Sequence, residues 1–122
     1  MIIPTLKYKD AKAAIEFLER AFGFERHTVM EDGGVIGHAE LRHGDGVVML
    51  GTAGHGDARF ATGRAVIYVV VEEPDALHDQ AAAAGAEIVM ELTDQDYGSR
   101  EFAAEDPEGN VWTFGTYNPF TA

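Results

Sequence analysis

The sequence predicts an α+β fold of two tandem β-α-β-β-β modules, and its clearest sign is an internal repeat. Residues 47–52 (VVMLGT) return 64 positions later as residues 111–116 (VWTFGT). Residues 21–25 (AFGFE) return 62 positions later as residues 83–87 (AAGAE). Both offsets are close to half of the 122-residue chain. Each half is therefore expected to contain the same supersecondary unit.

Each half also contains one helix with matching start and stop signals. In the first half Asp10 occupies an N-cap position, and Gly23 ends the apolar run. In the second half Pro74 lies in the first turn, and Gly85 follows the last turn. The apolar residues between these signals recur at helical spacing, as in Ala14, Ile15, Leu18, Ala21 and Phe22.

Strand-like runs bounded by turn residues surround each helix. In the first half they are residues 3–8, 24–30, 35–42 and 46–51, and in the second half residues 65–71, 86–91, 100–105 and 110–117. We expect one domain over residues 1–122, with module one at about 1–52, a linker rich in Gly and Ala at about 53–64, and module two at about 65–120.

Strand pairing predicts which side chains face away from the helices. A hairpin closed at Gly44-Asp45 puts Glu40 opposite Met49, with His38 and Arg42 on the same face. The other face is then apolar and suited to burial under the helix. The same pairing in the second hairpin predicts Arg100, Phe102, Ala104, Val111 and Thr113 on the helix-free face. It also predicts Ala103, Trp112 and Phe114 under the helix.

Composition excludes several classes of function. The formal net charge of −12 opposes binding to nucleic acid phosphates. No cysteine is present, so a disulfide framework and thiolate chemistry are excluded. The sequence contains no apolar run of about 18 residues and no signal-like start, which predicts a cytoplasmic protein without a membrane partner.

Several segments resemble the glyoxalase/bleomycin-resistance/extradiol-dioxygenase group, also called the vicinal oxygen chelate superfamily. They are residues 8–11 (YKDA), 15–17 (IEF), 21–24 (AFGF), 38–41 (HAEL) and 106–112 (DPEGNVW). The resemblance covers essentially the whole chain. It implies an open U-shaped barrel with a concave cavity, commonly completed by the second subunit of a homodimer.

Metal-dependent members of that group place His, Gln or Glu at four strand positions. Carried over to this sequence, those positions are Ile3, Met49, Ala65 or Val66, and Thr113. None of these side chains is a strong ligand for a divalent metal. We therefore predict no metal and no other cofactor, which favours the metal-free, bleomycin-resistance-like branch.

The leading hypothesis is a protein that binds or sequesters a small, partly apolar organic ligand in the concave cavity. The predicted ligand-binding residues are His38, Glu40, Met49, Arg100, Phe102 and Thr113. Tyr97, in the loop before residue 100, is a candidate lid over the ligand.

Two alternatives remain open at this point. The first is a lyase, isomerase or dioxygenase-like enzyme in which His38 and Glu40 form an acid–base pair or part of a relocated metal site. If these residues have only a structural role, Glu40 instead forms an ion pair with Arg42 or Arg100, and His38 is hydrogen-bonded nearby. The second is an interaction module whose cavity is filled by its own side chains and whose function lies in its dimer surface.

Overall fold

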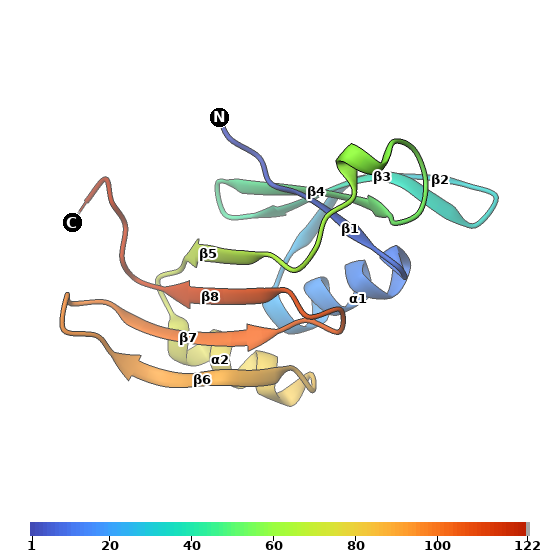
Figure 1. The fold of residues 1–122 in the computed structure, drawn as a ribbon. Helices are drawn as coiled ribbons and strands as arrows, with labels where there is room; N and C mark the ends of the chain where they lie inside the picture. The colour runs from blue at the N-terminus through green and yellow to red at the C-terminus, as the bar shows by residue number, and fades with distance from the viewer. Residues whose placement is uncertain (122) are drawn as a thin grey trace. The chain divides into compact units, whose positions relative to one another are not determined.

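The computed structural model describes residues 1–121, which form two compact units. The first unit covers Met1–Gly63, and the second begins at Arg64. Each unit contains one four-stranded mixed sheet and one α-helix in the order β-α-β-β-β, which confirms the predicted α+β fold of two tandem modules (Figure 1). The prediction that both modules form a single domain stays a prediction.

The first unit is built on the strand order β1-β4-β3-β2. Its elements are β1 (Thr5–Tyr8), α1 (Ala11–Phe22), β2 (Glu25–Asp32), β3 (Val35–His43) and β4 (Gly46–Thr52). β1 runs parallel to β4, and the other pairs are antiparallel hairpins. A short 3-10 helix, η1 (Ala58–Phe60), lies in the segment after β4.

The second unit repeats this arrangement with the strand order β5-β8-β7-β6. Its elements are β5 (Val66–Val70), α2 (Pro74–Ala83), β6 (Glu87–Asp94), β7 (Arg100–Glu105) and β8 (Val111–Gly115). In the view of Figure 1, α2 lies behind this sheet, and the face without a helix is toward the viewer. Within residues 1–121, neither α-helix is long and apolar enough to cross a membrane.

The caps of α1 follow from its sequence. The Asp10 side chain accepts a hydrogen bond from the backbone N–H of Ala13 at 3.0 Å, as an N-cap residue does. Gly23 adopts a left-handed conformation with φ 78°, and its N–H bonds back to the last turn. One face of the helix is buried against the sheet, where Ile15, Leu18 and Phe22 are at most 1% exposed.

The register of the first hairpin is as predicted. Glu40 is paired with Met49 and Arg42 with Val47, and the turn between His43 and Gly46 contains two residues. Gly44 has φ 57°, as a tight two-residue hairpin requires at its first central position. Ala39, Leu41, Val48 and Leu50 are buried on the opposite, helix-covered face.

The register of the second hairpin differs from the prediction by one residue on β7. Phe102 is paired with Phe114 and Ala104 with Trp112, so all four side chains lie on the helix-covered face. The cause is the turn, in which three residues separate the paired Asp106 and Asn110. A loop with an odd number of residues reverses the parity of one strand relative to a two-residue turn.

The predicted faces of Arg100, Phe102, Ala103 and Ala104 are therefore wrong. Those of Thr113, Trp112 and Phe114 are confirmed, because the parity of β8 is as expected. Glu101 and Ala103 now share the helix-free face with Thr113 and Gly115.

Candidate functional site

An open pocket lies in the second unit, on the helix-free side of its sheet. It is lined by three tyrosines together with a carboxylate and a proline, namely Tyr68, Tyr97, Tyr117, Glu101 and Pro119. Its volume is about 570 Å³, which is within the size range of pockets that hold small organic ligands. Most of its wall is aromatic, and Glu101 is the one carboxylic side chain among the five lining residues.

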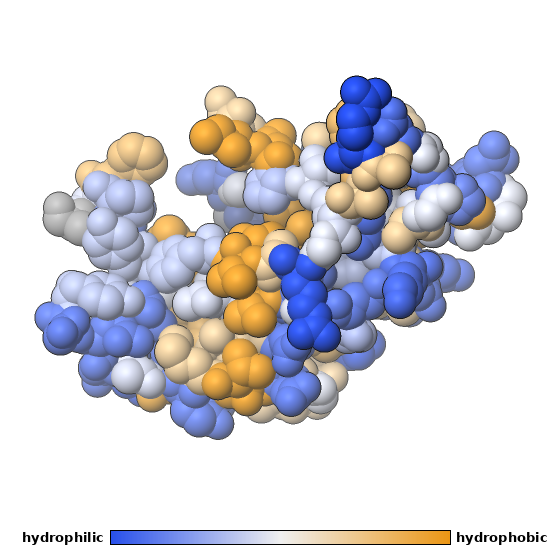
Figure 2. Space-filling view, viewed as in Figure 1, coloured by the Kyte–Doolittle hydropathy of each residue, from blue (hydrophilic) through white to orange (hydrophobic). Residues whose placement is uncertain are grey.

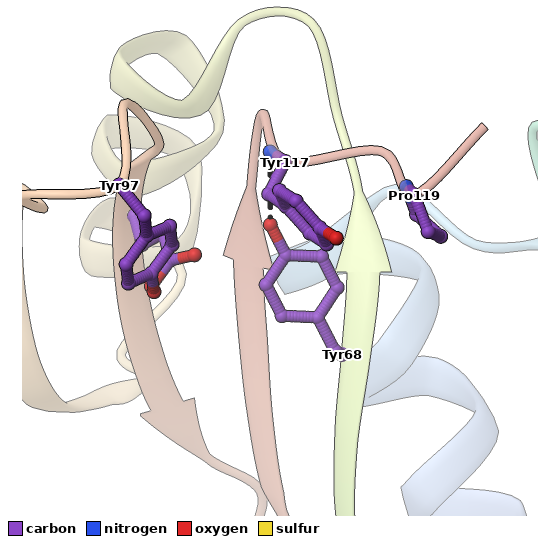
Figure 3. A pocket seen from close by; sticks show the side chains of 5 residues that line it. Tyr68, Tyr97, Tyr117 and Pro119 are labelled. Atoms are coloured by element: carbon purple, nitrogen blue, oxygen red, sulfur yellow. Dashed lines mark hydrogen bonds between the residues drawn. The ribbon is translucent and has the colours of Figure 1, made fainter. Parts of the chain in front are cut away.

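Strand pairing explains how these residues come together. Tyr68 lies on β5 and is paired with Thr113 of β8, while Glu101 of β7 is paired with Gly115 of β8. These three neighbouring strands thus present the pocket from one face of the sheet. Tyr97 comes from the loop before β7, and Tyr117 follows the end of β8 (Figure 3).

Two hydrogen bonds and one ring–ring contact hold the three tyrosines in place. The Tyr97 hydroxyl donates to Glu101 Oε1 at 2.8 Å. The backbone N–H of Tyr117 donates to the Tyr68 hydroxyl at 3.0 Å, the bond drawn in Figure 3. The Tyr97 and Tyr117 rings meet edge to face, with centroids 6.1 Å apart. Each ring therefore has a fixed anchor, although Tyr97 is 58% exposed and Tyr68 and Tyr117 are each 41% exposed.

The carboxylate at the base of the pocket is almost completely buried. Glu101 is 4% exposed, and within residues 1–121 no Lys, Arg or His side chain forms an ion pair with it. Its hydrogen bond with Tyr97 favours the neutral phenol and raises the pKa of Tyr97 to about 12. Burial, more than any other cause, raises the pKa of Tyr68, which also lies beside Glu101.

Gly115 is required for this arrangement because it leaves room for two side chains. A Cβ atom built on Gly115 would lie 2.5 Å from both Glu101 Cγ and the Tyr68 hydroxyl oxygen. Any larger residue there would push these groups apart. The close approach of the phenol and the carboxylate therefore depends on a glycine in β8.

Apolar side chains continue beyond the pocket. Figure 2 shows them as a band across the helix-free face of the second sheet. Val66 of β5 is 78% exposed and Val89 of β6 is 48% exposed. This face therefore offers apolar contact area next to the aromatic pocket.

The first unit carries a different polar group on its own helix-free face. His38 Nε2 lies 2.9 Å from Glu40 Oε2, and both side chains are about one-third exposed, at 38% and 31%. Glu40 is paired with Met49 across the hairpin, as predicted. His38, rather than Arg42 or Arg100, is thus the partner of Glu40.

Arg100 lies on the helix-covered side of the second sheet. Its guanidinium bonds to Asp75 of α2, with a shortest distance of 2.7 Å, and to Asp94 of β6 at 3.1 Å, and these carboxylates raise its pKa. Phe102 on the same side is fully buried and contacts His78 of α2 edge to face. The expectation that these two residues share a face with Thr113 is wrong, for the turn-parity reason given above.

The four positions that correspond to metal ligands do not suit a metal. Ile3, Met49, Val66 and Thr113 supply no imidazole and no carboxylate, and Ala65 supplies none either. Among residues 1–121, no group of three or more His, Cys, Asp or Glu side chains is placed to hold an ion. The prediction that the protein works without a metal stays a prediction.

Tandem β-α-β-β-β modules of this kind are the basis of one large group of ligand-binding proteins and enzymes. The family model described as Glyoxalase/Bleomycin resistance protein/Dioxygenase superfamily matches residues 4–114. The chain therefore belongs to this superfamily, as its sequence motifs suggested.

Three similar proteins illustrate the range of the match. An uncharacterized protein of Mycobacterium tuberculosis (strain ATCC 25618 / H37Rv) is 32% identical over 121 residues, covering 92% of this chain and 71% of its own length. The crystal structure of TioX from Micromonospora sp. ML1 is 31% identical, with a TM-score of 0.84 and 94% of each chain covered. The bleomycin-binding protein from bleomycin-producing Streptomyces verticillus, crystallised with copper(II)-bleomycin, is 26% identical, with a TM-score of 0.70. That match covers 96% of this chain and 95% of the other.

Sequence reasoning missed four of the five pocket residues, Tyr68, Glu101, Tyr117 and Pro119, and found Tyr97 only as a candidate lid. Tyr68 had a usable signal, because alternation along residues 66–70 puts it on one face with Val66 and Val70. Glu101 had none, since its face depends on the number of residues in the turn after β7.

Proposed function

We propose that this protein binds a small, partly apolar organic molecule, and that the aromatic pocket of the second unit is its binding site. The observation that carries the proposal is the group of three anchored, partly exposed tyrosines around a volume of about 570 Å³. Exposed aromatic side chains cost free energy in water unless a ligand covers them. Thr113, next to Tyr68 on the same face, is a further candidate contact.

Similarity to the bleomycin-binding protein supports a binding role. That protein was crystallised with copper(II)-bleomycin, and this chain shares its fold at 26% identity. The four metal-ligand positions of this chain are filled by non-ligating side chains, which favours binding over metal-dependent turnover. We further propose a cytoplasmic homodimer with no nucleic acid partner, to be checked by light scattering of the purified protein.

A thermal-shift screen that includes metal-free bleomycin and planar aromatic compounds tests the binding proposal. A ligand present at 100 times its Kd should stabilise the protein by about 2.7 kcal/mol. Tyr97→Ala should abolish the shift, because it removes one wall of the pocket. Phe60→Ala is the matched control, since it deletes a similarly exposed aromatic ring outside the pocket. A full shift in the Tyr97 variant would contradict the proposal.

The His38–Glu40 pair supports a second candidate function, an enzyme that uses it for acid–base chemistry. Their 2.9 Å contact on an accessible strand face is suited to proton transfer. Mass spectrometry of the screened compounds after incubation tests this possibility. Conversion by the natural protein that disappears in Glu40→Gln would favour the enzyme, and unchanged compounds would favour binding alone.

A further inference from the structure

We propose that the ligand of the aromatic pocket is a cation, an aromatic compound carrying a positively charged nitrogen, and that Glu101 is its counter-ion. This inference rests on the proposed function of the pocket. It adds the charge of the ligand and the residue that selects it.

The first argument is the state of Glu101. A buried carboxylate is costly unless a positive charge or several hydrogen bonds compensate for the water it has lost. Glu101 is 4% exposed, and its nearest polar neighbours are phenol hydroxyls. No basic side chain among residues 1–121 forms an ion pair with it. A cationic ligand would supply the missing partner.

The second argument is the chemistry of the surrounding wall. The faces of aromatic rings attract cations, and this attraction is stronger when the cation is shielded from water. Tyr68, Tyr97 and Tyr117 supply three such rings around one carboxylate. A neutral apolar ligand would be served equally well by phenylalanine and would leave the buried Glu101 side chain without a basic partner.

The third argument is that the chain holds the carboxylate and the rings together at close range. Tyr97 donates its hydroxyl to Glu101 at 2.8 Å, and Gly115 provides the space that lets Tyr68 approach the same side chain. The formal net charge of −12 also draws cations toward the protein and repels anions.

Thioflavin T and its neutral benzothiazole analogue, which lacks the ring N-methyl group, form a suitable probe pair. They differ mainly in one permanent positive charge. Fluorescence titration of the full chain should give a Kd about tenfold lower for thioflavin T than for the neutral analogue. Glu101→Gln should remove this preference, because it should weaken the binding of thioflavin T and leave the binding of the neutral analogue unchanged.

Glu105→Gln is the matched control for net charge. Glu105 lies on the same face of the same strand, about 13 Å along it, and is not part of the pocket wall. We expect this variant to keep the preference for the cation. If both variants lose the preference for thioflavin T to the same extent, overall charge rather than Glu101 attracts the probe, and the inference is overturned.

The remaining outcomes separate the inference from the proposed function. If the natural protein binds both probes equally and Tyr97→Ala binds neither, the pocket is a binding site without charge selection, and the inference is wrong. If the natural protein binds neither probe in the millimolar range, the proposed function fails as well. The comparison of the two probes on the natural protein needs no variant, so a poorly folding Glu101→Gln would not prevent the test.

Discussion

The two units share one topology but differ in what their helices and turns contribute. In the first unit, α1 is capped by Asp10 and buries seven residues, and the hairpin closes with a two-residue turn. In the second unit, α2 has no side-chain cap and buries only Pro74 and Ala81, and a hydrogen-bonded turn around Asp106 closes the hairpin. The second unit also holds the aromatic pocket. A repeated fold can thus combine one half with a capped, deeply buried helix and another half that holds an aromatic pocket.

The largest expected difference lies in the helices. Leu18→Ala in α1 should lower the free energy of unfolding by about 3 to 4 kcal/mol, because the side chain is fully buried and its loss leaves a cavity. Leu77→Ala in α2 should cost only about 1 kcal/mol, because this side chain is half-buried. Urea denaturation of both variants measures the two values. Equal costs would contradict the contrast between the helices.

The second expected difference lies in the hairpin turns. The Asp106 carboxylate accepts hydrogen bonds from the backbone N–H groups of Glu108 and Asn110 and from the indole N–H of Trp112. Asp106→Ala leaves buried donors without partners and should cost about 2 to 3 kcal/mol. Asp45→Ala, in the exposed turn of the first unit, should cost less than about 0.5 kcal/mol. A small effect at Asp106 in urea denaturation would show that the network is not important for stability.

A smaller difference concerns the helix N-caps. Asp10→Ala removes the hydrogen bond to the Ala13 N–H and should cost about 1 kcal/mol. Glu73→Ala should cost almost nothing, because the Glu73 side chain makes no cap hydrogen bond. Thermal unfolding followed by circular dichroism compares the two variants. A larger loss at Glu73 than at Asp10 would reverse the expected order.

The smallest expected effects are opposite pH dependences of the two units. Burial lowers the pKa of His43 below 6.5, so its contribution to stability is lost as the pH falls below that value. The pKa of His78 is raised by its hydrogen bond with Asp79 and then by Glu91, so its contribution is present below pH 6.5. That contribution is lost as the pH rises through the raised value.

Both histidine effects should be small, and that of His78 should be below about 1 kcal/mol because its carboxylate partners are well exposed. Unfolding free energies of His43→Gln and His78→Gln between pH 5 and 8 measure them. Relative to the natural protein, the first variant should lose less stability toward pH 5, and the second should lose less toward pH 8. If the unfolding free energies of the two variants changed with pH in parallel, the opposite pKa shifts of His43 and His78 would be contradicted.

The local features of the fold were predictable because they depend on short-range chemistry. Asp10 and Gly23 marked the ends of α1, and the two-residue turn at Gly44 fixed the register that pairs Glu40 with Met49. The site was harder to predict because its residues meet through long-range pairing. One extra residue in the turn after Asp106 moved Phe102 under the helix and brought Glu101 to the helix-free face. The parallel pairing that sets Tyr68 beside Thr113 has no local signal in the turn residues.

Amide chemical-shift mapping of the isotope-labelled protein during titration with thioflavin T tests the central claim most directly. The account predicts saturable shifts at Tyr68, Ser99, Glu101 and Tyr117, which line or adjoin the pocket. The amides around His38 and Glu40 should stay unchanged. Saturable shifts centred on His38 and Glu40, with none at the tyrosines, would contradict the assignment of the binding site to the second unit.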